Sequence, residues 1–170
     1  MLKDIYFLNS QGLSEELKSG TFSEIRALKH LIVLSVLGGF TFEFPVVTEF
    51  SETEISLWKN LGSLLMMIIA GVITYYGVWL TYQANEKGDG KDFFLRFISL
   101  SLPVGFKLAL YFLLTGLGLA VISALLITGL GSFGVVVSML VMFIATTAFY
   151  GLFFVQLRNH IARVSGYESQ

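Results

Sequence analysis

The stretch that decides the fold is residues 108–157, LALYFLLTGLGLAVISALLITGLGSFGVVVSMLVMFIATTAFYGLFFVQL. It lies between Lys107 and Arg158 and holds 50 residues without a single Asp, Glu, Lys or Arg. A second uncharged run, of 26 residues, separates Lys59 from Glu86. Because about 20 apolar residues in an α-helix cross a bilayer core of about 30 Å, these runs predict two spans and one span.

The composition of the whole chain agrees with this reading. The 170 residues are 55% hydrophobic and only 14% charged, and the mean hydropathy is +0.75. A soluble domain carries about 25% charged residues. The sequence therefore predicts an all-α polytopic membrane protein with one domain, because no polar stretch is long enough to fold alone.

Charge and cysteine content exclude several classes of function. The net charge of −1 provides no basic field, so no nucleic-acid partner is expected. The absence of cysteine excludes disulfides, thiolate catalysis and cysteine-ligated metals. His30 and His160 have no acidic or histidine neighbour at metal-ligand spacing, so no metal, cofactor or catalytic set is expected.

Four transmembrane helices are predicted, with both termini in the cytoplasm. Ten of the eleven basic residues then lie on the cytoplasmic side, and only Lys59 lies outside, as the positive-inside rule requires. Ser23 is expected to cap a helix that begins at Glu24. The predicted parts are a cytoplasmic N-terminal segment (1–26), a transmembrane domain (27–156) with spans at about 27–47, 58–82, 108–130 and 134–156, and a cytoplasmic tail (157–170).

An interfacial helix is predicted before the third span. One helix over residues 97–130 would be about 50 Å long, which exceeds the bilayer. Pro103 and Gly105 offer a break, so residues 93–102 are expected to lie at the cytoplasmic surface. Residues 83–92 are read as the preceding loop and residues 129–132 as a tight turn between the last two spans.

Small residues recur at four-residue spacing in the last two spans. Such stripes let helix backbones approach closely in lipid. They fit packing within a single bundle, and they also fit contacts between copies in a homo-oligomer. The residues are Gly116, Ala120, Ala124, Gly134 and Ser138.

Two ionisable residues near the ends of spans are candidates for a polar site. Glu43 is the single acid inside a span, and an intramembrane acid points to cation or proton binding. Its place close to the outer interface also fits an ordinary interfacial carboxylate. Lys107 can extend its stem to the inner interface, where a lipid phosphate of the cytoplasmic leaflet is the expected partner.

The loop before the third span is the candidate docking surface for a soluble protein. It is the longest internal cytoplasmic loop, and its charges are Asp89, Lys91, Asp92 and, just beyond it, Arg96. Although it contains acids and glycines, it lacks the register of a calcium loop and the Gly-Lys-Ser/Thr of a phosphate loop.

Residues 85–103, NEKGDGKDFFLRFISLSLP, resemble a signature of small bacterial four-helix membrane proteins of uncharacterised function, and residues 7–29 have a similar character. In size and helix number the chain is also similar to the membrane subunit of the Kiwa anti-phage system. These resemblances imply a bacterial inner-membrane location and a role in defence, as a sensor or pore. They bring no catalytic residue.

Three functions follow from these observations. The first is a non-enzymatic, oligomeric membrane module that docks a soluble cytoplasmic partner. The second is a small transporter for a lipid or amphipathic solute, working through Glu43 or Lys107. The third is a membrane enzyme acting on lipid headgroups, with His30 or His160 as the base.

Overall fold

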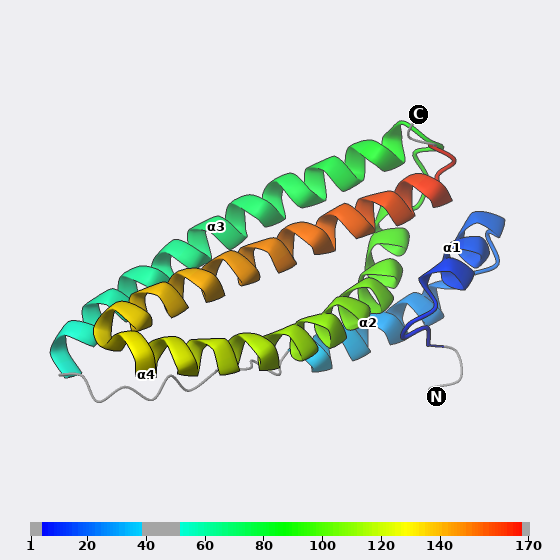
Figure 1. The fold of residues 1–170 in the computed structure, drawn as a ribbon. Helices are drawn as coiled ribbons and strands as arrows, with labels where there is room; N and C mark the ends of the chain where they lie inside the picture. Colours follow the sequence, from blue (N-terminus) through cyan, green and yellow to red (C-terminus); the bar gives the residue numbers. More distant parts are fainter. Residues whose placement is uncertain (1–4, 39–51, 168–170) are drawn as a thin grey trace.

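The computed structural model describes residues 5–38 and 52–167, and over these ranges the chain is entirely helical (Figure 1). The helices are α1 (Ser10–Ser19), α2 (Glu24–Gly38), α3 (Glu52–Glu86) and α4 (Phe93–Val164). The predicted start of a helix at Glu24 is confirmed, and the carbonyl of Ser23 accepts from the backbone N–H groups of Arg26 and Ala27.

Helix α4 is a hairpin of two arms. Its backbone leaves helical geometry at Gly131, with φ 58° and ψ −133°, a conformation that a side chain would strain. Figure 1 shows the chain reversing there, so that residues 93–130 form a first arm and residues 132–164 a second arm beside it. The turn predicted at residues 129–132 is confirmed.

The expected break at Pro103 is wrong, because α4 continues through this residue. A proline inside a helix removes one hydrogen bond and clashes with the preceding turn, which bends the helix without having to end it. Figure 1 shows the ribbon of α4 changing direction within its first turns. The boundaries of the neighbouring elements also shift, since α3 extends to Glu86 and the loop shortens to residues 87–92.

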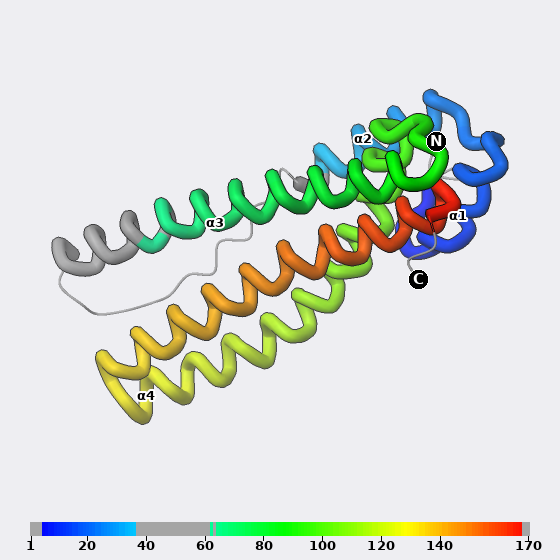
Figure 2. Tube along the Cα trace, turned by 90° about the horizontal axis from the view of Figure 1, so that it is seen from above, coloured from blue at the N-terminus to red at the C-terminus, as the bar shows by residue number. Residues whose placement is uncertain are grey.

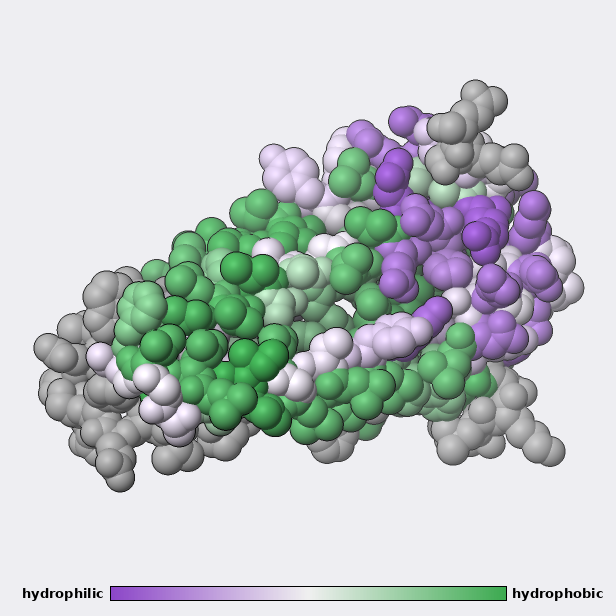
Figure 3. Space-filling view, viewed as in Figure 1, coloured by the Kyte–Doolittle hydropathy of each residue, from purple (hydrophilic) through white to green (hydrophobic). Residues whose placement is uncertain are grey.

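Within the described residues, two helices are long and apolar enough to cross a membrane, namely residues 64–86 of α3 and the whole of α4. Their large apolar side chains face outward: Val72 is 50% exposed, Leu114 68% and Val121 62%. On the face shown in Figure 3, apolar residues form a broad continuous region away from the polar end. Exposed apolar surface of this kind is typical of membrane or protein contacts, and together with the two long apolar helices it suggests membrane association.

The polar residues gather at the end of the molecule that lies away from the turn at Gly131, and we call this end the head. It comprises α1, the first turns of α2, the loop 87–92 and the parts of α3 and α4 beside them (Figures 2 and 3). Both ends of the described chain lie there (Figure 1). Its apolar core is formed by Leu13, Leu17, Phe22, Ala27, Leu100, Leu157, Ile161 and Val164.

Candidate functional site

The loop between α3 and α4 is held by the buried guanidinium of Arg96. Its Nη1 and Nη2 donate to the two carboxylate oxygens of Asp89 at 2.6 and 2.7 Å, and Nη1 also donates to Oδ1 of Asn85 at 2.9 Å. These hydrogen bonds, assisted by one from the backbone N–H of Lys91, lower the pKa of Asp89 to about 2. The carboxylate is therefore ionised at any physiological pH.

The same loop is fastened to the end of α4. The backbone N–H of Asp89 donates to the carbonyl of Ser165 at 2.9 Å, and the Ser165 hydroxyl donates to the carbonyl of Ala84 at 3.3 Å. A Cβ at Gly88 would overlap the Ser165 carbonyl, so only glycine allows this approach. The loop is thus a fixed surface rather than a loose connection.

These contacts divide the four predicted docking residues into two pairs. Asp89 and Arg96 are engaged with each other inside the chain. Lys91 and Asp92 are exposed, and Asp92 adopts a left-handed backbone conformation with φ 48° that turns the chain into α4. Docking of a partner remains a prediction, and within this set Lys91 and Asp92 are the residues whose side chains are free to meet one.

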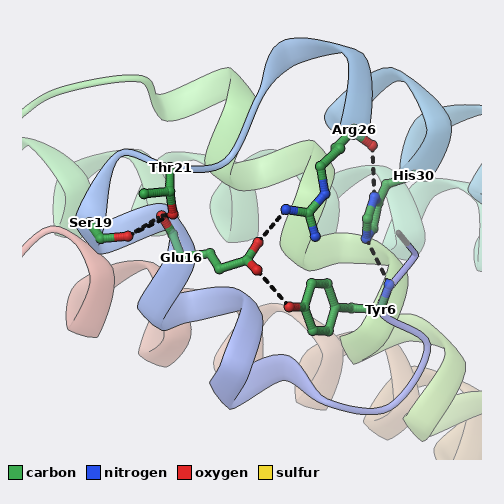
Figure 4. A network of polar contacts seen from close by, with 6 residues as sticks. All are labelled: Tyr6, Glu16, Ser19, Thr21, Arg26 and His30. Atoms are coloured by element: carbon green, nitrogen blue, oxygen red, sulfur yellow. Dashed lines mark hydrogen bonds and ion pairs between the residues drawn. The ribbon is translucent and has the colours of Figure 1, made fainter. Parts of the chain in front are cut away.

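A second polar network joins the N-terminal segment to α1 and α2 (Figure 4). Glu16 accepts a hydrogen bond from the hydroxyl of Tyr6 at 2.9 Å and forms an ion pair with Arg26. The guanidinium of Arg26 also lies 4.7 Å from the centre of the Phe22 ring. Cation–π attraction of this kind adds to the ion pair.

His30 completes this network and uses both ring nitrogens. Its Nε2 accepts from the backbone N–H of Tyr6 at 3.1 Å, so the proton must reside on Nδ1, which donates to the carbonyl of Arg26 at 2.8 Å. The side chain is fully buried. With both nitrogens engaged, His30 has none left to act as a base on an external substrate.

Sequence reasoning missed Tyr6 and Glu16 as parts of this network. Tyr6 lies 24 positions from His30, and Glu16 lies ten positions from both Tyr6 and Arg26. Such pairings follow from how the segments pack and have no local signal. The one detectable sign was the four-residue spacing of Arg26 and His30, which places them on one helix face.

A polar pocket of about 520 Å³ opens between the start of α1 and the two arms of α4. It includes Lys107, which the sequence singled out for a lipid phosphate, and it also includes His160 and Arg163. We call it the cationic pocket. Its lining residues are Leu8, Asn9, Ser10, Gln11, Lys107, Gln156, Asn159, His160 and Arg163.

The small-residue stripes are divided between the interior and the surface. Gly116, Gly134 and Ser138 are buried, and a Cβ at Gly134 would overlap the backbone of the opposite arm at Leu126. Close packing of the two arms therefore accounts for Gly134. Ala120 and Ala124 are exposed. They are the members of the set that another copy can reach.

The remaining candidates give no site. Glu43 lies outside the described residues. Among residues 5–38 and 52–167, no group of three His, Asp or Glu side chains is arranged to hold a metal ion.

Over residues 5–38 and 52–167, the chain is an all-helical protein in which two helices are long and apolar enough to cross a membrane. Comparisons with protein families, with curated proteins and with solved structures find no match to this chain. The resemblances drawn from the sequence therefore rest on residues 7–29 and 85–103 and on size alone.

Proposed function

We propose that the chain is an oligomeric, non-enzymatic module of a bacterial inner membrane that docks a soluble cytoplasmic protein. In this proposal it crosses the membrane four times, by a span from α2 onward, by α3 and by the two arms of α4. Both termini are cytoplasmic. A role in defence, as a sensor or pore, follows only from the resemblance to the Kiwa membrane subunit.

The observation that carries the proposal is the folded head. A bundle that only crosses a membrane has no need to fix its polar segments, yet here α1, the start of α2 and both ends of α4 pack on one apolar core. The loop 87–92 is hydrogen-bonded to the end of α4. The Arg96–Asp89 and Arg26–Glu16 pairs hold this assembly in place. Fixed charges on a rigid surface favour recognition by a partner, because little ordering is needed on binding.

Docking is tested by reversing the exposed charges of the loop. The protein is purified from its own host through a C-terminal tag, and soluble proteins present in stoichiometric amount are quantified. We expect the variant Lys91→Glu with Asp92→Lys to lose such a partner and the matched variant Lys91→Arg to keep it. Equal recovery with both variants would contradict docking at this loop.

Oligomer formation is tested at the exposed small residues. Replacing Ala120 and Ala124 with Leu adds bulk where two copies would meet, so the mass of the protein in nanodiscs should fall toward that of a protomer. Val121→Leu, which adds bulk at a neighbouring exposed position, serves as the control. An unchanged mass in the double variant would refute the assignment of this stripe.

The lipid transporter remains the second candidate, since Lys107 lies in the cationic pocket. It predicts that Lys107→Gln reduces the flux of an amphipathic anion across proteoliposomes, whereas the membrane-module proposal predicts unchanged permeability. His30 offers no free nitrogen, so a headgroup enzyme would depend on His160.

A further inference from the structure

We infer that the cationic pocket is a binding site for a phosphate-bearing anion. Two cationic side chains, Lys107 and Arg163, line one cavity together with the imidazole of His160 and with amide and hydroxyl groups. Among residues 5–38 and 52–167, no Asp or Glu lines it.

The two strong cations are available to a ligand. Lys107 is on the first arm of α4 and Arg163 on the second, and both side chains are exposed. Within the described ranges, neither is paired with an acid, in contrast to Arg26 and Arg96. Burial and, after it, the charges of Arg163 and Lys107 lower the pKa of His160, so both cations lie within electrostatic range of this one ring.

The start of α1 forms the third side of the pocket, beside the two arms of α4, and its helix dipole also favours an anion. Asn9 caps α1, and its Oδ1 accepts from the backbone N–H of Gly12 at 2.9 Å. Because the first residues of α1 line the pocket, the positive end of the helix dipole lies beside it. Ser14 ties this helix to α4 through a contact of 3.4 Å between its Oγ and Nδ1 of His160. This side of the pocket is thereby held beside the two cations.

The chemistry and size select phosphate among anions. A phosphate has several oxygens that accept from an ammonium, a guanidinium and neutral amides at once. The volume of about 520 Å³ is in the range of small-molecule sites and is suitable for a headgroup or a small phosphate ester.

The position of the pocket favours a lipid as the source of the phosphate. On the first arm, Lys107 directly precedes the uncharged stretch 108–157, and on the second arm Arg158 directly follows it. The pocket therefore lies where the apolar region meets the head. This choice of source rests on the membrane location proposed above, whereas binding of a phosphate group as such does not.

The test compares two sources of phosphate. In the lipid experiment, the protein is reconstituted in nanodiscs of phosphatidylcholine alone or mixed equally with phosphatidylglycerol. The lipids that it retains are counted by native mass spectrometry. In the soluble-phosphate experiment, inorganic phosphate and glycerol 3-phosphate are titrated by calorimetry into the protein in a mild detergent, which does not require that the chain spans a bilayer. Retained phosphatidylglycerol identifies a lipid site, and saturable binding of either soluble phosphate identifies a site for a soluble anion.

Variants assign the binding to the pocket. Lys107→Gln with Arg163→Gln should weaken binding roughly tenfold for each charge removed. The matched control is Arg158→Gln. It removes an exposed charge from the second arm of α4, which also carries Arg163, but outside the pocket. The exchange Lys107→Arg with Arg163→Lys keeps the charge and should keep binding.

The inference is overturned if neither source of phosphate binds. It is equally overturned if the double Gln variant, with an unchanged helical circular dichroism spectrum, binds as well as Arg158→Gln. If the chain is not embedded in a membrane, no lipid is retained but soluble phosphate still binds. Failure of the proposed location is therefore distinguishable from failure of the site.

Discussion

The Arg96–Asp89 pair predicts an unequal response to the loss of its two partners. The side chain of Arg96 is 5% exposed and that of Asp89 is 36% exposed. Asp89→Asn leaves a guanidinium buried without a counter-charge, whereas Arg96→Met leaves a carboxylate that water can reach. The substitution of the acid should therefore be the more damaging of the two.

The magnitudes follow from these exposures. Removing one partner of a buried ion pair costs about 3–5 kcal/mol, and an Asn oxygen still accepts one hydrogen bond, so Asp89→Asn should cost about 3 kcal/mol. Arg96→Met leaves only the partly exposed Asp89 without its partner, so the loss resembles that of an exposed ion pair, about 1 kcal/mol. Because the loop also loses this anchor, we expect a total cost of about 1–2 kcal/mol. The double variant should resemble Arg96→Met alone, because no charge is then left unpaired.

The measurement is the free energy of unfolding of the protein in a mild detergent. Sodium dodecyl sulfate is titrated in, and the helical circular dichroism signal is followed. Asp92→Asn is the matched control, because Asp92 is exposed in the same loop and Asn tolerates its left-handed conformation. We expect it to stay within about 0.5 kcal/mol of wild type.

The reasoning would be refuted by a larger cost for Arg96→Met than for Asp89→Asn. It would also be refuted if the costs of the two single variants simply add in the double variant, because residues in direct contact should show a coupling energy of about 0.5–3 kcal/mol.

Three further predictions concern packing, acid stability and the N-terminal segment. Gly134→Ala should destabilise the hairpin by about 1–3 kcal/mol, because the new methyl group meets the Leu126 backbone. Gly118→Ala, which has open space around it, should not destabilise the protein, and thermal unfolding of the two variants compares them. The pKa of Asp89 is lowered from 3.8 to about 2, so its contribution to stability is complete above about pH 4 and is lost as the pH falls toward 2. Acid titration of the wild type should show this loss, and acid titration of Asp89→Asn should not. His30→Leu removes the acceptor of the part-buried backbone N–H of Tyr6, so proteolysis of the N-terminal segment should accelerate roughly tenfold. An unchanged cleavage rate would contradict the role of His30.

The sequence was informative wherever a local rule applies. The uncharged runs predicted long apolar helices, Ser23 predicted the start of α2, and the glycines near residue 131 predicted a turn. Each of these depends on neighbouring residues alone. The four-span topology is a finer statement that stays a prediction.

Local rules failed where packing decides. Pro103 is buried in the head, so the surrounding side chains hold the helix together on both sides of it and the chain bends instead of breaking. Arg96 was read as exposed for docking, because its sequence neighbours do not reveal that Asp89 folds back onto it from seven positions away. The cationic pocket likewise joins residues from α1 and both arms of α4, which only the fold brings together.

The turn at Gly131 has a consequence for biogenesis. In a membrane, the two arms of α4 are joined without a hydrophilic connection, and residues 129–134 (GLGSFG) carry no charge. Translocating this tip requires no transfer of a charged side chain through the lipid, and its remaining polar groups are the backbone of the turn and the hydroxyl of Ser132. The second half of the chain can therefore enter the bilayer as a preformed pair, with its orientation set by the basic residues at the other end.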